Sequence, residues 1–400
     1  MGLLKLFFTL FVFSFPIAEV GRVQLENGIA FTVNDLFLGL LVGYWIIYRF
    51  LVIKKPLNFY LKKPILLFVS IAFFSLLINF FNLSINNFLV SALYLVRFVF
   101  YLSLYFIVKE FSLTFKRKIP FFLIFSGSLA VVLGYIQYLF YPSLRNLFYL
   151  GWDEHLYRMF STFLDPNFAG VFFAIFFIFS LGFIKESTNK KNNLKLLTLS
   201  IISLITLTAV YLTYSRSAFI TLIVGVTTYL ILSRRKKLII AVLGLLILII
   251  FLAPKSFMTE GTNFLRINSS TARISSIEQG IQIFKKSPVL GVGFNAYRYA
   301  QNKYVGLNNS YWQVTHSGAG TDNSIVFLLA TTGVVGLVSY LYLLYKIFAL
   351  SKENMKKNKY AVVLFSSLLG LIVGSIFINS LFYVLLLEWI WILAGLTESS

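Results

Sequence analysis

Residues 163–184 read FLDPNFAGVFFAIFFIFSLGFI, and this stretch decides the class of fold. Its only charged residue is Asp165, and the run from Ala169 to Phe179 is entirely apolar. A helix needs about 20 such residues to cross the hydrocarbon core of a bilayer, so the stretch predicts a membrane-spanning helix. The run is continuous rather than alternating, which favours a helix over a strand of a membrane barrel.

Similar runs recur along the whole chain. The 400 residues are 58% hydrophobic and 12% charged, and they include 45 phenylalanines, which is more apolar surface than a soluble domain can bury. We therefore predict an all-α polytopic membrane protein with about twelve transmembrane helices. The predicted helices cover residues 3–18, 29–48, 64–81, 88–108, 119–140, 163–184, 196–214, 218–232, 238–253, 323–345, 360–378 and 381–396.

The net charge of +21 follows from where the basic residues fall. Alternate connections between the predicted helices, together with Lys5, hold 23 of the 35 Lys and Arg residues, whereas the short connections opposite hold only Arg22, Arg145, Arg158 and Arg216. Because short basic loops stay in the cytoplasm, the pattern predicts a multi-pass protein with both termini cytoplasmic. The charge is thus a signal of topology, and we expect no nucleic-acid partner. The N-terminal apolar run lacks a cleavage site of small residues, so we expect it to be retained as a helix.

One long polar interval, residues 254–322, separates the ninth and tenth predicted helices. The chain therefore divides into helices 1–9 (residues 1–253), a large external loop (254–322) and helices 10–12 with the C-terminus (323–400). Basic residues in the loop outnumber acidic ones, which indicates an anionic ligand. The basic residues are Lys255, Arg266, Arg273, Lys285, Lys286, Arg298 and Lys303, against Glu260, Glu278 and Asp322.

Arginines on the external side are not explained by topology. Arg216 lies in a short turn, YSRS at residues 214–217, where it is either an interfacial anchor or a bidentate clamp on a phosphate. Arg273 begins an amphipathic helical segment, an unfavourable place for a cation unless an anion binds there. Arg158 lies in an external loop that leads to Asp165, which we expect to cap a helix beginning at Pro166.

His316 lies in a glycine-rich stretch just before a helix that Asp322 is expected to cap. The chain has no cysteine, two histidines and no spaced carboxylate cluster. We therefore expect neither a metal site nor a cofactor.

The sequence resembles the O-antigen ligase and polymerase superfamily of bacterial membrane glycosyltransferases. The resemblance rests on residues 162–170, 214–218 and 273–293, and on His316 leading into Asn323, Ser324 and the sequence up to Gly336. It implies a GT-C type fold in the bacterial inner membrane, with an active site on the external face. It also implies transfer of a glycan from undecaprenyl diphosphate to an acceptor, as in lipopolysaccharide biosynthesis, with Arg216, Arg273 and His316 as functional residues.

This resemblance and the residue chemistry predict a metal-independent, inverting transfer. Guanidinium groups would bind the diphosphate, with Arg158, Arg266 and Arg97 as further candidates, and neutral His316 would accept the proton of the acceptor hydroxyl. Arg97 lies in the middle of a predicted span, where it pairs with Asp35, pairs with Glu388 or lines the diphosphate cavity. The expected partners are membrane lipids, the lipid-linked glycan donor and a lipid or glycan acceptor such as lipid A core.

Other functions stay open at this point. A polysaccharide polymerase of the same superfamily differs only in its acceptor, which is another lipid-linked chain. A transporter of lipid-linked glycans would be expected to show internal repeats and broken helices near the membrane midplane. A regulatory or scaffolding membrane protein would leave the external arginines and His316 without a purpose.

Overall fold

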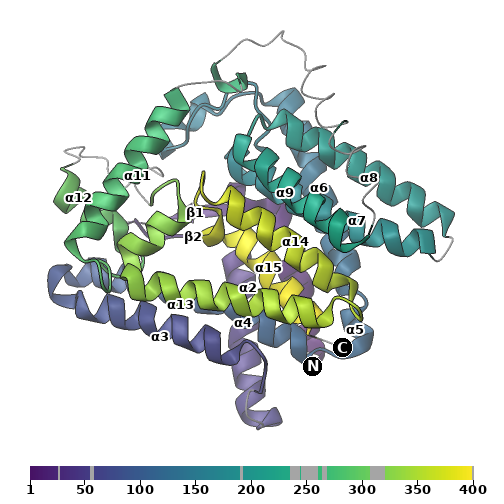
Figure 1. Cartoon of the computed structure of the whole chain (residues 1–400), viewed down its shortest axis with the longest axis horizontal. Coiled ribbons are helices and arrows are strands. Elements are labelled where there is room, and N and C mark those ends of the chain that lie inside the picture. Colours follow the sequence, from purple (N-terminus) through teal and green to yellow (C-terminus); the bar gives the residue numbers. More distant parts are fainter. Residues whose placement is uncertain are drawn as a thin grey trace.

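The computed structural model describes residues 1–25, 28–54, 58–189, 192–234, 244, 260–263, 268–306 and 320–398. These residues form a helical bundle with a small antiparallel hairpin, in which β1 (Arg22–Gln24) pairs with β2 (Ala30–Thr32) (Figure 1). The α-helices are α1 (Gly2–Phe13), α2 (Val33–Tyr48), α3 (Lys62–Ile78), α4 (Ile85–Glu110), α5 (Leu113–Lys116), α6 (Ile119–Phe140), α7 (Pro166–Asn189), α8 (Asn193–Leu212), α9 (Arg216–Leu232), α11 (Asn268–Lys286), α12 (Tyr297–Val305), α13 (Ser324–Asn354), α14 (Lys359–Gly374) and α15 (Val384–Thr397).

The predicted helical class is confirmed. Eleven of the twelve predicted segments contain a helix, and the remaining one, residues 238–253, lies outside the described residues except for residue 244. Within the described part of the chain, six helices are long and apolar enough to cross a membrane, or seven if the bent N-terminal pair is one span. Helices α9, α14 and α15 are apolar but shorter. The number of twelve spans, the extent of the external loop and the GT-C type fold stay predictions.

The first predicted helix is not continuous as expected. Helix α1 ends at Phe13, and the chain bends by 64° into a 3₁₀-helix, Phe15–Gly21. Pro16 lacks the N–H group that would continue the helical hydrogen bonds, which explains the break. Ser14 stabilises the bend, because its Oγ lies 2.7 Å from Asn34 Oδ1 in α2.

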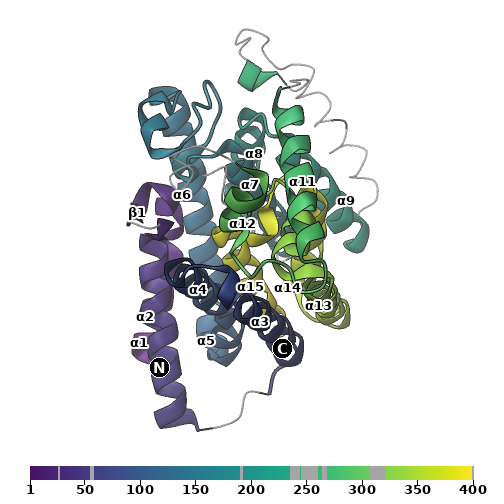
Figure 2. The ribbon, with the colours of Figure 1, turned by 90° about the vertical axis from the view of Figure 1, so that its left-hand side faces the viewer.

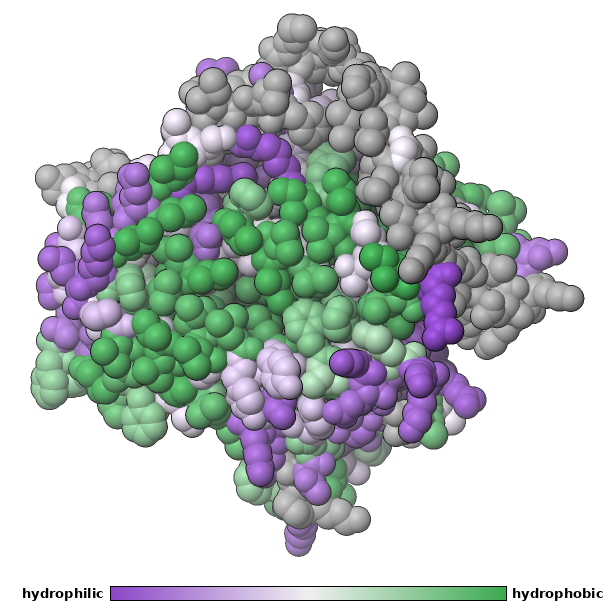
Figure 3. All heavy atoms as spheres, viewed as in Figure 1, coloured by the Kyte–Doolittle hydropathy of each residue, from purple (hydrophilic) through white to green (hydrophobic). Residues whose placement is uncertain are grey.

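Apolar side chains fill the interior of the bundle and also cover its outside. Every residue of α15 after Val384 is buried, and Trp389 packs edge-on against Phe172 and Phe176 of α7. On the outside, α3 and α13 expose apolar side chains such as Phe74 and Val338. Figure 3 shows a broad apolar surface, in green, on the face of the molecule in view. Such a large exposed apolar area fits contact with lipid tails.

Several of the lysine-rich segments meet at one end of the bundle. Lys109 Nζ at the end of α4 lies 3.6 Å from Glu398 Oε1 near the C-terminus, and the backbone N–H of Tyr60 donates to the same oxygen at 3.3 Å. Lys116 Nζ donates to Lys109 O at 2.8 Å. Figures 1 and 2 place both chain termini at this end and α11 far from it. The meeting of these segments agrees with the predicted topology, and their cytoplasmic location stays a prediction.

Helix α13 is broken at Gly333, where residues 288–293 pack against it. Gly333 has φ of 66°, and four backbone hydrogen bonds join residues 288–293 to residues 330–335. Ser75 of α3 and Asn79, the residue that follows this helix, donate hydrogen bonds of 2.6 and 2.9 Å to carbonyl groups of the same segment. The segment follows α11 directly, so these contacts fix α11 against α3 and α13.

Candidate active site

The turn between α8 and α9 places Arg216 away from the lysine-rich end. Helix α8 ends at Leu212, and Tyr214 adopts a left-handed conformation with φ of 49°. Ser215 caps α9, because its Oγ accepts a hydrogen bond from the N–H of Ala218 at 3.4 Å. Arg216 is therefore the first residue of α9, where the N-terminal backbone N–H groups also favour an anion.

Arg216 and Arg273 come together from α9 and α11. Arg216 Nη2 donates a hydrogen bond of 3.0 Å to Ser270 Oγ, one helical turn before Arg273. Burial lowers the pKa of Arg273, Asp322 raises it, and the positive charge of Arg216 lowers it again. Two neighbouring guanidinium groups create a positive potential that suits a ligand with more than one negative charge.

Two carboxylates lie near this arginine pair. Burial raises the pKa of Asp322, Arg273 lowers it, and the negative charge of Asp165 raises it further. The Asp322 side chain is nevertheless exposed, so protein surrounds the carboxylate on several sides while water still reaches it. The site thus combines cations that can hold an anion with a carboxylate that can take up a proton.

Asp165 caps α7, as predicted from its position before Pro166. Its Oδ1 accepts hydrogen bonds from the backbone N–H groups of Asn167 and Phe168 at 2.6 and 3.4 Å. Helix α7 accordingly begins at Pro166, the one residue that has no N–H to be satisfied there. The cap fixes the Asp165 carboxylate at the N-terminal end of α7, beside the arginine pair.

Arg158 is 5% exposed and lies beneath the Arg216 turn. Its Nε donates to Thr213 O at 2.9 Å, and its Nη2 donates to Asn167 Oδ1 at 3.3 Å. The same amide oxygen accepts a hydrogen bond from Ser215 Oγ at 3.1 Å. These contacts connect residues 158–167 to residues 213–215 and thereby hold the turn that carries Arg216 in place.

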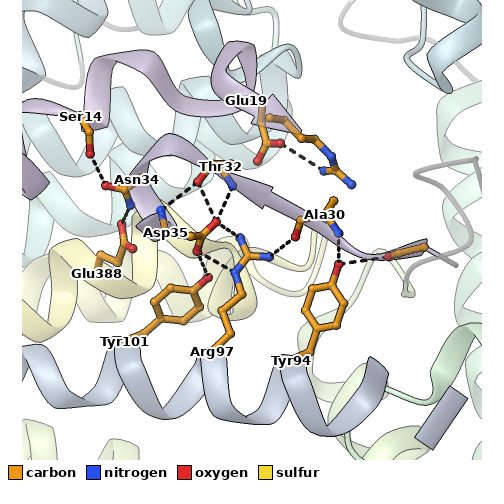
Figure 4. Close-up of polar contacts among 12 residues, drawn as sticks. Ser14, Glu19, Ala30, Thr32, Asn34, Asp35, Tyr94, Arg97, Tyr101 and Glu388 are labelled. Carbon is orange, nitrogen blue, oxygen red and sulfur yellow. Dashed lines mark hydrogen bonds and ion pairs between the residues drawn. The ribbon is translucent and has the colours of Figure 1, made fainter. Parts of the chain in front are cut away.

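Arg97 forms a bidentate ion pair with Asp35, which is one of the three alternatives left open by the sequence. Its Nε and Nη2 donate to the two carboxylate oxygens at 2.7 and 2.6 Å, and its Nη1 donates to Ala30 O at 3.1 Å (Figure 4). Glu388 instead accepts a hydrogen bond from Asn34 at 2.6 Å. Arg97 therefore ties α4 to the start of α2, and its role in binding a diphosphate stays a prediction.

Two predicted site residues, His316 and Arg266, lie outside the described residues. The structure does correct the start of the helix that follows His316. Asn323, not Asp322, caps α13, since its Oδ1 accepts hydrogen bonds from the N–H groups of Ile325 and Val326. Either side chain is a good helix cap by type, so the sequence alone could not choose between neighbours.

Sequence reasoning missed the polar partners that orient the arginines, Ser270 and Asn167. A signal for Ser270 exists, because it precedes Arg273 by three residues and such residues share one face of a helix. The link between Asn167 and the Arg216 turn spans 48 residues of sequence and has no local signal. In the described part of the chain, no group of three or more His, Cys, Asp or Glu side chains is arranged to hold a metal ion.

Comparison with protein families yields a match of residues 201–341 to the O-antigen ligase family, Wzy_C. The matched region begins in α8 and ends in α13, and it includes Arg216, Arg273 and Asp322. No match is found among curated proteins. The match agrees with the resemblance seen in the sequence, since three of its four motifs lie within the matched region. The matched residues make up about a third of the chain, and over this region the chain is similar to the O-antigen ligase family.

Proposed function

We propose that this protein transfers a glycan from undecaprenyl diphosphate to an acceptor hydroxyl at the external face of the bacterial cytoplasmic membrane. The observation that carries the proposal is the meeting of Arg216 and Arg273, which come from α9 and α11 within the region matched to the O-antigen ligase family. A polyprenyl diphosphate keeps its lipid in the bilayer and its charge at the surface. Its receptor therefore needs cations at the end of a helical bundle.

The arginine pair also suits the chemistry of transfer. When the acceptor oxygen attacks the anomeric carbon, the bond from that carbon to the phosphate oxygen breaks and the diphosphate leaves with the electron pair. Fixed guanidinium groups stabilise the developing negative charge without needing a metal ion. Direct attack of this kind inverts the anomeric centre. The sequence assigns the proton acceptor to His316, and this assignment belongs to the proposal.

The other arginines take different parts in this proposal. Arg158 holds the turn that carries Arg216, because its donors bind Thr213 O and Asn167 Oδ1. Arg266 precedes α11 in the sequence and is a further candidate to bind the diphosphate. Arg97 shares its donors between Asp35 and Ala30, so a contact with the diphosphate would require it to exchange one of these partners.

Reconstituted transfer tests the proposal directly. The full chain in proteoliposomes is supplied with an undecaprenyl-diphosphate-linked glycan and a lipid A core acceptor, and glycosylated acceptor and released undecaprenyl diphosphate are quantified. We expect both products from the native protein and from Arg145→Ala, which removes an exposed arginine of another segment. We expect neither from Arg216→Ala or Arg273→Ala. Equal transfer by these two variants and the native protein would refute the proposed role of the arginine pair.

A polymerase remains the nearest alternative, because the sequence resembles a superfamily of both ligases and polymerases, which differ in their acceptor. The glycan that accumulates on the lipid carrier in a deletion strain distinguishes the two. Finished long chains indicate that a ligase was lost, whereas single repeat units indicate that a polymerase was lost.

The break in α13 does not indicate that the protein is a transporter. A transporter would use the free backbone groups of a broken helix to bind its solute. Here residues 288–293 of the same chain form backbone hydrogen bonds with the broken region. The break therefore anchors a neighbouring segment.

A further inference from the structure

Gln137 lies near the end of α6, in a segment long and apolar enough to cross a membrane, and is 9% exposed. Its Oε1 accepts hydrogen bonds of 2.8 and 3.0 Å from the backbone N–H groups of Phe160 and Ser161. Its Nε2 donates to the carbonyl oxygens of Tyr141 and Arg158 at 3.0 and 3.4 Å. The side-chain amide thus makes four hydrogen bonds, and each partner is a backbone group.

The arrangement of these partners fits glutamine by its chemistry and not only by its size. Two N–H groups point at one end of the Gln137 amide, and two carbonyl groups point at the other. A glutamate carboxylate has acceptors but no donors, so one of its oxygens would face both carbonyl groups. An apolar side chain of similar length would supply none of the four bonds.

The segment that Gln137 binds, residues 158–161, is irregular although it is buried. Each of its residues is 5% exposed or less. The backbone between residues 155 and 164 has left-handed φ values at four residues other than glycine. Such conformations cost free energy and persist only where the surrounding structure holds them. Buried backbone groups outside a helix also need hydrogen-bond partners, and Gln137 supplies several of these.

Helix α6 has a face that receives this irregular segment. Ser161 Oγ donates to Ala130 O at 2.8 Å. A Cβ at Gly134 would lie 3.1 Å from Met159 Sδ, so glycine allows the segment to approach the helix closely. Ala130, Gly134 and Gln137 follow one another at intervals of three or four residues and therefore share one side of the helix.

The irregular segment in turn binds the turn that carries Arg216. The backbone N–H of Met159 donates to the carbonyl oxygen of Leu212, the last residue of α8, at 2.8 Å. Arg158 Nε donates to Thr213 O at 2.9 Å. Two sets of hydrogen bonds therefore connect the Gln137 amide in α6 to the residues just before α9.

We propose that Gln137 is a positioning residue for the Arg216 guanidinium in the binding of the lipid diphosphate. This inference rests on the proposed function. Gln137 does not touch the ligand; it holds the irregular segment, which holds the turn between α8 and α9. Loss of the amide should let this turn move, so that Arg216 no longer stays beside Arg273 and the diphosphate binds more weakly.

Equilibrium binding of undecaprenyl diphosphate to the full chain in lipid nanodiscs tests the inference. Gln137→Met keeps the length of the side chain and forms none of the four bonds. We expect it to weaken binding by about 10-fold, a typical coupling within one hydrogen-bond network. Unfolding midpoints establish that the variant is folded under the conditions of the binding measurement.

Ser126→Ala is the matched control. Ser126 is also buried in α6, about three helical turns from Gln137, and its Oγ donates to Val12 O at 2.7 Å. The variant thus loses a buried hydrogen bond of the same helix that has no path to the Arg216 turn. We expect its affinity for the diphosphate to equal that of the native protein.

Gln137→Glu is a second variant, which carries the comparison if Gln137→Met does not fold. It keeps acceptors for the N–H groups of Phe160 and Ser161 and loses both donors. We expect weaker binding than in the native protein, with a smaller loss than in Gln137→Met.

A combined variant distinguishes positioning from a general loss of stability. If Gln137 acts through Arg216, adding Gln137→Met or Gln137→Glu to Arg216→Ala should not weaken binding any further. Independent effects would instead multiply, and this result would overturn the inference.

The remaining outcomes separate this inference from the proposed function. The inference alone is overturned if Arg216→Ala weakens binding while the folded Gln137 variants bind as tightly as the native protein. It is also overturned if Ser126→Ala loses as much affinity as they do. If the native protein does not bind undecaprenyl diphosphate, the proposed function fails and the role of Gln137 fails with it.

Discussion

The guanidinium of Arg216 is oriented by a neighbour that only the folded chain supplies. Its Nη2 donates to Ser270, while Arg158 and Asn167 form hydrogen bonds with the turn between α8 and α9 that carries it. A planar group held in this way can bind a phosphate through two parallel hydrogen bonds, which the single ammonium of lysine cannot reproduce. The geometry of the side chain should therefore matter as well as its charge.

Arg216→Lys tests this point at a single residue. We expect it to lose about as much transfer activity as Arg216→Ala, on the order of 10²- to 10³-fold in kcat, the scale seen when one donor to a developing negative charge is removed. Initial rates in proteoliposomes with equal amounts of inserted protein provide the measurement. Near-native activity of the lysine variant would show that charge alone is sufficient.

The cap of α7 offers a prediction about stability. Asp165→Ala should lower the free energy of unfolding by about 1 kcal/mol, because two backbone N–H groups lose their acceptor. Asp165→Asn should change it by only a few tenths, since an amide oxygen can also cap a helix. Thermal unfolding of the detergent-solubilised protein compares the two variants. If Asp165→Ala unfolded at the same temperature as Asp165→Asn and the native protein, the cap would not contribute to stability.

Single residues also show the limits of prediction from sequence. Asp165 was correctly identified as a cap, because it directly precedes Pro166 and both signals are local. The cap of α13 was misplaced by one residue, from Asn323 to Asp322. The partner of Arg97 was left open, since Asp35 lies 62 residues away and only the folded chain selects it over Glu388. His316 lies outside the described residues, so its place in the site stays a prediction.

At the scale of elements, the junction between residues 288–293 and α13 positions the site. This segment directly follows α11, which carries Ser270 and Arg273, so a loosened junction would move both relative to Arg216. Gly333 permits the junction in two ways. Its φ of 66° is costly for other residues, and a Cβ there would lie 2.1 Å from Val289 O.

Gly333→Ala should therefore destabilise the protein by more than about 2 kcal/mol, from the left-handed conformation and the clash together. Gly39→Ala is a suitable control, because Gly39 lies in α2 and a Cβ there meets no atom within 4 Å. In that helix alanine should be neutral or slightly stabilising. Unfolding midpoints in detergent give the comparison, and equal midpoints for the two variants would contradict this view of the junction.

Helix boundaries were predicted correctly where a local sequence signal marks them, and were missed where a distant segment determines them. Helix α6 occupies the predicted residues 119–140, because a long apolar run with proline near its start defines both ends. The bend after α1 was missed, although Pro16 marks it, since the apolar run continues past the proline. The break in α13 could not be predicted from the apolar pattern, because the segment that packs there lies about 40 residues earlier in the chain.

At the scale of the whole molecule, the two ends of the bundle carry different types of charged side chain. Lys109, Lys116 and the C-terminal Glu398 meet at one end, whereas Arg216 and Arg273 lie together away from it. The distribution of lysines in the sequence was sufficient to predict this division, because it depends on counting residues in loops. The meeting of two arginines from different helices required the fold.

The natural absence of cysteine makes the topology easy to test. We expect Asn302→Cys, an exposed position on α12, to react with a membrane-impermeant maleimide added to intact cells. Lys357→Cys, an exposed position between α13 and α14, should react only after the cells are opened. Labelling in the reverse order would place the arginine pair in the cytoplasm and remove the site from the external face.

Binding of the diphosphate itself tests the central claim most directly. The affinity of undecaprenyl diphosphate for the full chain in lipid nanodiscs should be compared among the native protein, Arg145→Ala and the double variant Arg216→Ala with Arg273→Ala. Loss of two charged hydrogen-bond donors, at about 1.5–3 kcal/mol each, should weaken binding by about 10²- to 10⁴-fold in the double variant and leave Arg145→Ala unchanged. Equal affinity in all three proteins would contradict the claim that this arginine pair holds the diphosphate.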